Sequence, residues 1–174
     1  MIILGIDPGS RITGFGIIDN QANRIKYIHS GKIKVVGDSL PQRLGNIFAR
    51  IDEVIQQYHP EQMGIENVFM ARNPDSALKL GQARGAAICA AHQAGLEIAE
   101  YAAREVKQAI VGKGAASKDQ VQHMVKRLLG LQQTLQADEA DGLAIAICHA
   151  QYYATQQRTG IDASLLKRRR SRRR

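Results

Sequence analysis

The order of the hydrophobic patterns along the chain restricts its fold more than any other feature. Three strand-like segments come first, at 2–7, 14–19 and roughly 24–36, and the link 8–13 has the composition of a hairpin turn. Later patterns predict a helix over 44–58, a strand at 62–68, a helix from about 74 to 93, a strand at 96–101, and helices at 103–111, 117–129 and 138–155. This order predicts an α/β fold: a mixed five-stranded sheet, antiparallel in its first three strands, with helices on both faces.

The length and the charge distribution predict one folded domain and a basic tail. The chain has 174 residues, which is enough for one ordinary hydrophobic core. Residues 167–174 contain 7 of the 24 Lys and Arg residues, so the rest of the chain has 17 basic against 16 acidic side chains. We therefore predict a domain over 1–155 and a disordered tail over 156–174. The tail either binds nucleic acid without sequence preference or serves only as a solubilising end.

The sequence predicts a cytoplasmic protein that does not enter a membrane. Its first residues lack a basic region and reach a carboxylate at position 7, which is typical of a core strand and not of a signal peptide. No apolar run approaches the length of a membrane span. Cys89 and Cys148 both lie in Ala- and Ile-rich helical patterns, where reduced thiols pack as small hydrophobic groups.

Four carboxylates occur at the ends of predicted buried elements. Asp7 ends the first apolar strand, and Glu66 ends the apolar run that begins at position 62. Asp138 and Asp141 are three residues apart near the start of the last helix, so both project from one face. A buried carboxylate is costly unless a cation holds it, and a divalent metal ion is the usual solution.

Each of these acids has a simpler explanation when it is considered alone. The pair near the start of the last helix could consist only of first-turn residues, which the helix dipole favours. Asp7 and Glu66 could instead be neutralised by ion pairs with Arg11 or Arg72. Such ion pairs would have to arise twice independently, so the four acids together favour a metal site.

The predicted metal site and the basic chain suit hydrolysis of a nucleic acid backbone. Cutting a phosphodiester requires neutralised non-bridging oxygens, an activated water and a stabilised leaving oxygen, and two Mg²⁺ ions held by carboxylates supply all three. The five histidines are scattered singly, and no His or Cys cluster has the spacing of a zinc site.

Several stretches of the chain match one known family in order and with few gaps. The first is 5–11 (Gly-Ile-Asp-Pro-Gly-Ser-Arg) with 13–16 (Thr-Gly-Phe-Gly), and 65–69 (Ile-Glu-Asn-Val-Phe) follows. The others are 73–85, 100–103, 106–108, 118–125 and 137–144. On these residues the chain resembles the RuvC family of Holliday junction resolvases, whose fold is ribonuclease H-like. The resemblance covers nearly all of 1–155.

The resemblance implies a function in homologous recombination and DNA repair. It implies a homodimer that binds a four-way DNA junction and nicks two strands of like polarity symmetrically, leaving ligatable 5′-phosphate ends. It also implies two Mg²⁺ ions per active site, with Mn²⁺ as an alternative, and a RuvA–RuvB branch-migration complex as partner. The catalytic and metal-binding acids would be Asp7, Glu66, Asp138 and Asp141.

The resemblance also implies which residues contact DNA. Phe69 would stack at the opened junction, and Lys107 and Lys118 would contact the DNA backbone. Further candidates for phosphate contacts are Arg72, which lies in the polar loop that follows Phe69, and Arg84, Arg104 and Lys113. From the residues alone, Phe69 could equally be a core side chain, and single lysines are usually only solvated.

Three other functions compete with this one. A YqgF-like nuclease acting on RNA would share the first strand and the acids, but the stretches 69–85 and 137–141 argue against it. An ATPase of the actin and sugar-kinase type needs two lobes, and 174 residues provide only one. A non-enzymatic binding module would use the basic tail as its main DNA contact.

Overall fold

The computed structural model describes residues 1–21, 24–68 and 73–159, and its centre is a five-stranded sheet. The strands are β1 (Ile2–Asp7), β2 (Ile12–Gln21), β3 (Arg24–Lys34), β4 (Gln62–Glu66) and β5 (Glu97–Tyr101), in the spatial order β3-β2-β1-β4-β5. β1 and β2, like β2 and β3, are antiparallel, whereas β4 is parallel to β1 and β5 is parallel to β4. The predicted mixed sheet is therefore confirmed.

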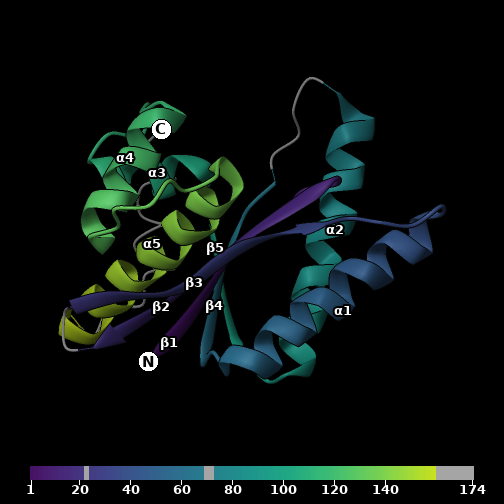
Figure 1. Ribbon diagram of the computed structural model, residues 1–174, viewed down its shortest axis with the longest axis horizontal. Helices are drawn as coiled ribbons and strands as arrows, with labels where there is room; N and C mark the ends of the chain where they lie inside the picture. Colours follow the sequence, from purple (N-terminus) through teal and green to yellow (C-terminus); the bar gives the residue numbers. More distant parts are fainter. Residues whose placement is uncertain (22–23, 69–72, 160–174) are drawn as a thin grey trace.

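Helices cover both faces of this sheet (Figure 1). One face carries α1 (Leu40–Tyr58) and α2 (Pro74–Gln93), and the other carries α3 (Ala103–Val111), α4 (Lys118–Leu129) and α5 (Ala137–Thr159). None of the helices in the described ranges is both long and apolar enough to cross a bilayer.

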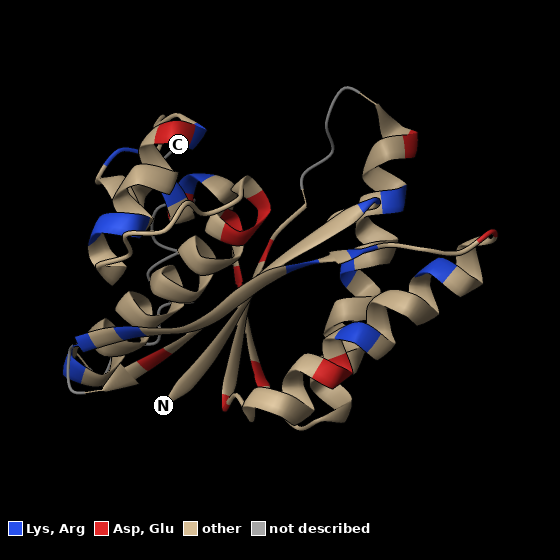
Figure 2. Cartoon of the chain, viewed as in Figure 1, with Lys and Arg blue, Asp and Glu red and all other residues tan. Residues whose placement is uncertain are grey.

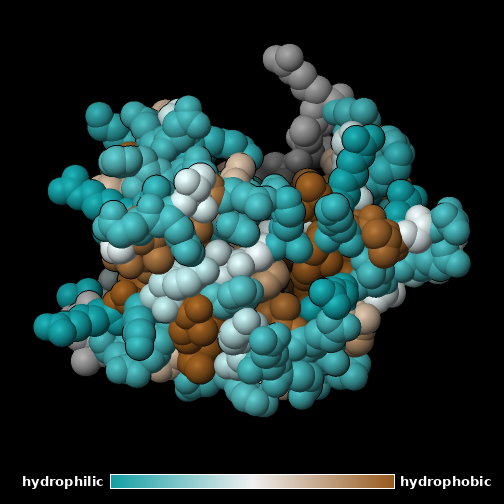
Figure 3. All heavy atoms as spheres, viewed as in Figure 1, coloured by the Kyte–Doolittle hydropathy of each residue, from teal (hydrophilic) through white to brown (hydrophobic). Residues whose placement is uncertain are grey.

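The strands bury side chains on both faces because their residues alternate between two hydrophobic clusters. In β1, Ile3 belongs to the cluster under α5, whereas Leu4 and Ile6 belong to the cluster under α1 and α2. The face shown in Figure 3 is mostly hydrophilic, and hydrophobic groups reach it in several places, among them the region where α1 meets the sheet. A sheet buried on both faces explains why its strands have nearly continuous apolar sequences.

Local sequence signals fix most of the element ends. Ser39 caps α1 by accepting a hydrogen bond from the Gln42 N–H, and His59 ends the helix in the left-handed conformation. Several predicted boundaries differ from the structure, among them the start of β2 and the end of α5. β2 begins at Ile12, inside the predicted turn. Its pairing with β3 extends this far because the Val35 N–H, just after β3, donates a hydrogen bond to the carbonyl of the neighbouring Arg11. α5 continues to Thr159, past the predicted end at 155.

A row of small residues crosses the sheet under α5. The row contains one residue from each strand, and each pairs with the next: Ser30, Gly16, Gly5, Gly64 and Ala99. A Cβ atom on Gly5 would lie 2.2 Å from the carbonyl oxygen of Gly142 in α5, and one on Gly16 would lie 2.5 Å from the Leu143 nitrogen. The backbone of α5 thus rests directly on the backbone of the sheet, which only glycine permits at such short separations.

Candidate active site

Asp7 and Glu66 end two adjacent parallel strands on the face that α5 covers. Residues two apart in a strand share a face, so Asp7 lies on the side of Gly5, and Glu66 lies on the side of Gly64. Both of these glycines face α5. Since Ile6 pairs with Ile65, the next residue of each strand brings the two carboxylates to the same edge of the sheet.

The start of α5 brings the second pair of acids to this edge. The β2 partner of Asp7 is Gly14, and a Cβ atom on Gly14 would lie 2.1 Å from the Asp138 carbonyl oxygen. Asp141 follows one turn later on the same face of the helix. Figure 2 shows acidic positions in the first turns of α5 beside those at the strand ends. The structure therefore brings the four predicted acids together.

Asp7 and Glu66 are partly buried and are repelled by neighbouring acids, and both effects raise their pKa values. Burial, together with the nearby carboxylates of Glu66, Asp141 and Asp138, raises the pKa of Asp7 to about 7. Burial and the Asp141 charge also raise the pKa of Glu66. No cationic side chain in the described ranges forms an ion pair with Asp7 or Glu66. Arg11, one of the two arginines considered as an ion-pair partner for these acids, instead lines a hollow with residues of α1 and α2.

Two lysines are the cations that face the acids. The Lys118 Nζ lies 3.2 Å from Asp141 Oδ2, and this carboxylate raises the pKa of Lys118. Lys118 also lowers the pKa of both Asp7 and Glu66, and Lys107 of α3 lowers that of Glu66. The two predicted DNA-binding lysines therefore border the acids, from two different helices. The Lys118 side chain is 77% exposed, so its position is compatible with a further ligand from solvent.

The donor set fits a hard divalent cation. All of the donors are carboxylate oxygens, and such a cation would relieve the repulsion that raises the pKa of Asp7. Within the described residues, no three acidic, His or Cys side chains converge into a complete metal-binding group. The carboxylates lie close enough to one another to raise the pKa values of Asp7 and Glu66. In the ion-free protein, the ion pair of Lys118 with Asp141 balances part of their charge. Mg²⁺ needs few protein ligands because it retains several waters.

Arg84 of α2 holds the end of β4 in place, a role that the sequence did not reveal. Its Nε donates to the Glu66 carbonyl oxygen at 3.3 Å, and Nη2 donates to Asn67 Oδ1 at 3.1 Å. The same nitrogen forms an ion pair with Glu100 of β5 at 2.7 Å. We considered this arginine from sequence as a phosphate contact, but the structure engages it with the protein. Two other predicted DNA contacts, Phe69 and Arg72, lie outside the described residues.

A second set of ionisable groups lies deeper under α5 and is fully hydrogen-bonded. The Tyr101 hydroxyl is 2.7 Å from His149 Nδ1, and His149 Nε2 is 2.8 Å from Gln62 Oε1. Gln62 Nε2 donates to Glu97 Oε2 at 2.9 Å, so Oε1 is its acceptor and the imidazole proton is on Nε2. Burial lowers the pKa of His149 to about 4. We call these four side chains the histidine network.

Comparisons with known proteins agree on one family. A family model described as crossover junction endodeoxyribonuclease RuvC matches residues 3–149. The crossover junction endodeoxyribonuclease RuvC of Tolumonas auensis is 61% identical over 149 residues, which is 86% of each chain. That of Yersinia enterocolitica is 56% identical over 167 residues, 96% of each chain.

A solved structure shares the fold over nearly the same range. It is Thermus thermophilus RuvC in complex with a Holliday junction substrate, which matches with a TM-score of 0.81 and 36% identity. The match covers 90% of this chain and 96% of that one. The fold is thus the ribonuclease H-like one that the sequence resemblance implied.

Proposed function

Because the chain belongs to the family of crossover junction endodeoxyribonuclease RuvC, we propose that it resolves Holliday junctions in recombination and repair. It is an endodeoxyribonuclease of a family that uses divalent metal ions, and we infer Mg²⁺ as the physiological ion, two per site, with Mn²⁺ as an alternative. Work on chromosomal DNA would place the protein in the cytoplasm.

One observation supports the active-site assignment above the others. The carboxylate of Asp7 is partly buried, it has acidic neighbours on one adjacent strand and one helix, and burial with those neighbours raises its pKa to about 7. A fold that needed only stability would pair or remove such a charge. We therefore assign Asp7, Glu66, Asp138 and Asp141 as the acids that hold the metal ions.

The chain's own groups have distinct tasks in this proposal. Bound metal ions would supply charge neutralisation at the phosphate, an activated water and a stabilised leaving oxygen. Lys118 balances Asp141 in the ion-free protein, and with its ammonium group exposed it is placed to contact a DNA phosphate once the acids are otherwise neutralised. Lys107 borders Glu66 and would contact the same strand. We keep Phe69 as the stacking aromatic and Arg72 as a phosphate contact.

We also propose a homodimer, since two copies related by a two-fold axis would present two active sites to a four-way junction. Support comes from α2, where a methyl group added at Gly81 or Gly85 would meet nothing among the described residues. On the same helix, Leu78 is 62% exposed. A second copy would cover this open face. A RuvA–RuvB complex is the partner that we infer for the junction-bound dimer.

We assign the nuclease to residues 1–155 and treat 156–174 as a basic tail. The acids and both lysines precede residue 155. A chain truncated after Thr159, where α5 ends, should therefore retain junction cleavage. Loss of junction affinity on truncation would instead favour a binding module that depends on its tail.

The direct test is cleavage of a labelled four-way junction beside linear duplex, single strand and RNA–DNA hybrid, with Mg²⁺ and with EDTA. We expect paired nicks in the junction alone, only with Mg²⁺. Cleavage of the RNA strand, or binding without cleavage, would overturn the assigned substrate.

A matched pair of substitutions tests the acids in the same assay. Asp7→Asn should abolish nicking while junction binding in EDTA persists, because the side chain keeps its volume and loses its charge. Asp52→Asn, at a half-buried aspartate of α1, should leave both properties unchanged. Equal nicking by the two variants would remove Asp7 from the active site.

A further inference from the structure

A basic hollow of about 380 Å³ lies beyond the acids, between the first hairpin turn and the helices of the opposite face. Its polar lining consists of Ser10 and Arg11 from the turn, Arg43 from α1, and Ser76 and Lys79 from α2. No acidic side chain lines it among the described residues. Three cations and two hydroxyls are the groups that bind a phosphate.

Arg43 is the residue that points most clearly to a missing ligand. Its Nε is buried and has no hydrogen-bond partner in the part of the chain that the structure describes. A buried N–H without an acceptor costs free energy, and native proteins rarely leave one unpaired. Lys79, in contrast, is already paired with Asp75 at 2.6 Å. An anion in the hollow would therefore be held mainly by Arg43 and Arg11.

The hollow also lies close to the acids along the chain. Ser10 follows Asp7 by three residues, so the two Cα atoms are at most about 11 Å apart. Measured along the axis of a duplex, at about 3.4 Å per phosphate of one strand, that separation corresponds to at most about three nucleotides. A strand whose phosphate sits at the acids would therefore bring one of its next phosphates to the hollow.

From these observations we propose that the hollow binds a backbone phosphate of the DNA substrate, a few nucleotides from the phosphate that is cut. Arg43 and Arg11 donate to the phosphate oxygens, and Ser10 and Ser76 complete the site. The inference rests on the proposed function because it takes DNA as the ligand. By binding this phosphate, the hollow would hold the substrate strand in register over the acids.

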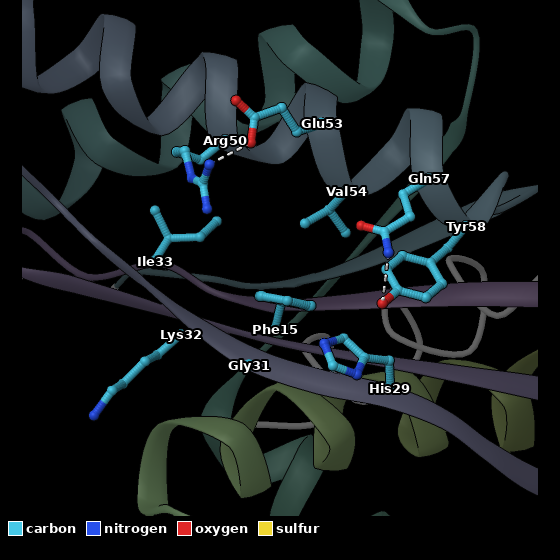
Figure 4. A pocket seen from close by; sticks show the side chains of 10 residues that line it. All are labelled: Phe15, His29, Gly31, Lys32, Ile33, Arg50, Glu53, Val54, Gln57 and Tyr58. Atoms are coloured by element: carbon cyan, nitrogen blue, oxygen red, sulfur yellow. Dashed lines mark hydrogen bonds and ion pairs between the residues drawn. The ribbon is translucent and has the colours of Figure 1, made fainter.

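A second hollow provides the control. It lies between β3 and α1 and also contains an arginine, Arg50 (Figure 4). There, however, the guanidinium forms an ion pair with Glu53. Lys32, which also lines it, points away from α1 and donates to Gln136 at 2.5 Å. This hollow has its cations satisfied, so the loss of Arg50 should not affect DNA binding.

The test is the salt dependence of junction binding, measured in EDTA so that no cleavage occurs. We expect Arg43→Gln to weaken binding about tenfold and to lower the slope of log Kd against log salt by about one, since one phosphate contact is lost. Arg43→Lys should restore most of the slope, and Arg50→Gln should match the wild type. Arg11→Gln, at an exposed position, should repeat the effect without risk to folding.

The remaining outcomes overturn the inference and can be told apart from failure of the proposed function. An unchanged slope in both Arg43→Gln and Arg11→Gln would exclude the phosphate site, even if the wild type cleaves junctions normally. Inorganic phosphate that raises the Tm of the wild type but not of Arg43→Gln, with DNA binding unaffected, would assign the hollow to free phosphate instead. Absence of junction cleavage by the wild type would overturn the proposed function. The slope of log Kd against log salt, measured without cleavage, reports the phosphate contact whether or not the wild type cleaves.

Discussion

The two ends of the α5 contact treat ionisable groups in opposite ways. At the edge of the sheet, Asp7 and Glu66 face other acids and have raised pKa values. Deeper under the same helix, every polar atom linking Tyr101, His149 and Gln62 has a hydrogen-bond partner, and the histidine is neutral. Burial alone thus does not mark a functional site. What distinguishes Asp7 and Glu66 is that no cationic side chain among the described residues forms an ion pair with them.

The sharpest way to break this comparison uses two glutamates on neighbouring strands. Glu66→Gln should lower junction cleavage by about 1,000-fold, because one of the four acids is lost. Glu97→Gln, which alters the far end of the histidine network, should leave the cleavage rate within about twofold of the wild type. Single-turnover cleavage with saturating Mg²⁺ measures both. Comparable losses in the two variants would mean that the network takes part in the chemistry.

A substitution in the row of small residues should damage both regions together. In Gly5→Ala the new methyl group would lie 2.2 Å from the Gly142 carbonyl oxygen, so α5 must move away from the sheet. We expect a loss of about 3 kcal/mol or more in the free energy of unfolding, measured by urea denaturation. Gly45→Ala in α1, where the methyl group meets open space among the described residues, should keep or slightly raise stability. A Gly5→Ala protein as stable as the wild type would contradict the direct backbone contact.

The pH dependence of stability should differ in sign between the two regions, and Asp7 is the stronger case. Its pKa is about 7 in the fold against 3.8 for the free group, so the folded state holds the proton more tightly. Stability from this group is present at low pH and is lost as pH rises from about 4 to about 7. In EDTA at pH 8, Asp7→Asn should therefore be about 2 kcal/mol more stable than the wild type, with little difference at pH 4. A variant that is less stable at pH 8 would refute the unpaired charge.

His149 should act in the opposite direction. Its pKa is about 4 in the fold against 6.5 for the free group, so the unfolded state binds the proton first. Stability is complete above pH 6.5 and falls as pH decreases towards 4, by about 1–2 kcal/mol at pH 5. A histidine-specific NMR titration reports the group directly. A His149 that titrates near 6.5 would show that the network is open to solvent.

Element order and element ends could be predicted because they depend on local signals. The cap at Ser39 and the end of α1 at His59, for example, each depend on a few neighbouring residues. The row of small residues could not be predicted, since it depends on the pairing register of all five strands. The contacts of Arg84 could not be predicted for a related reason: an arginine on a helix gives no sign that Glu100 of a strand will be its partner.

The four acids were predicted from their positions in the sequence, but the contacts around them were not. That Lys118 would pair with Asp141 follows from the packing of α4 beside α5, which no spacing predicts. The hollow around Arg43 likewise combines three separate segments. Sequence identifies the groups that do chemistry more readily than the contacts that orient them.

The glycine row has a consequence for how this protein tolerates change. Because α5 touches the sheet through main-chain atoms at the glycines, the separation between the strand acids and the helix acids is set by contacts that substitutions away from these glycines do not alter. Hydrophobic residues elsewhere in the two clusters can be exchanged for others of similar volume without moving the four acids. Melting temperature and turnover should therefore vary independently in such repacked variants.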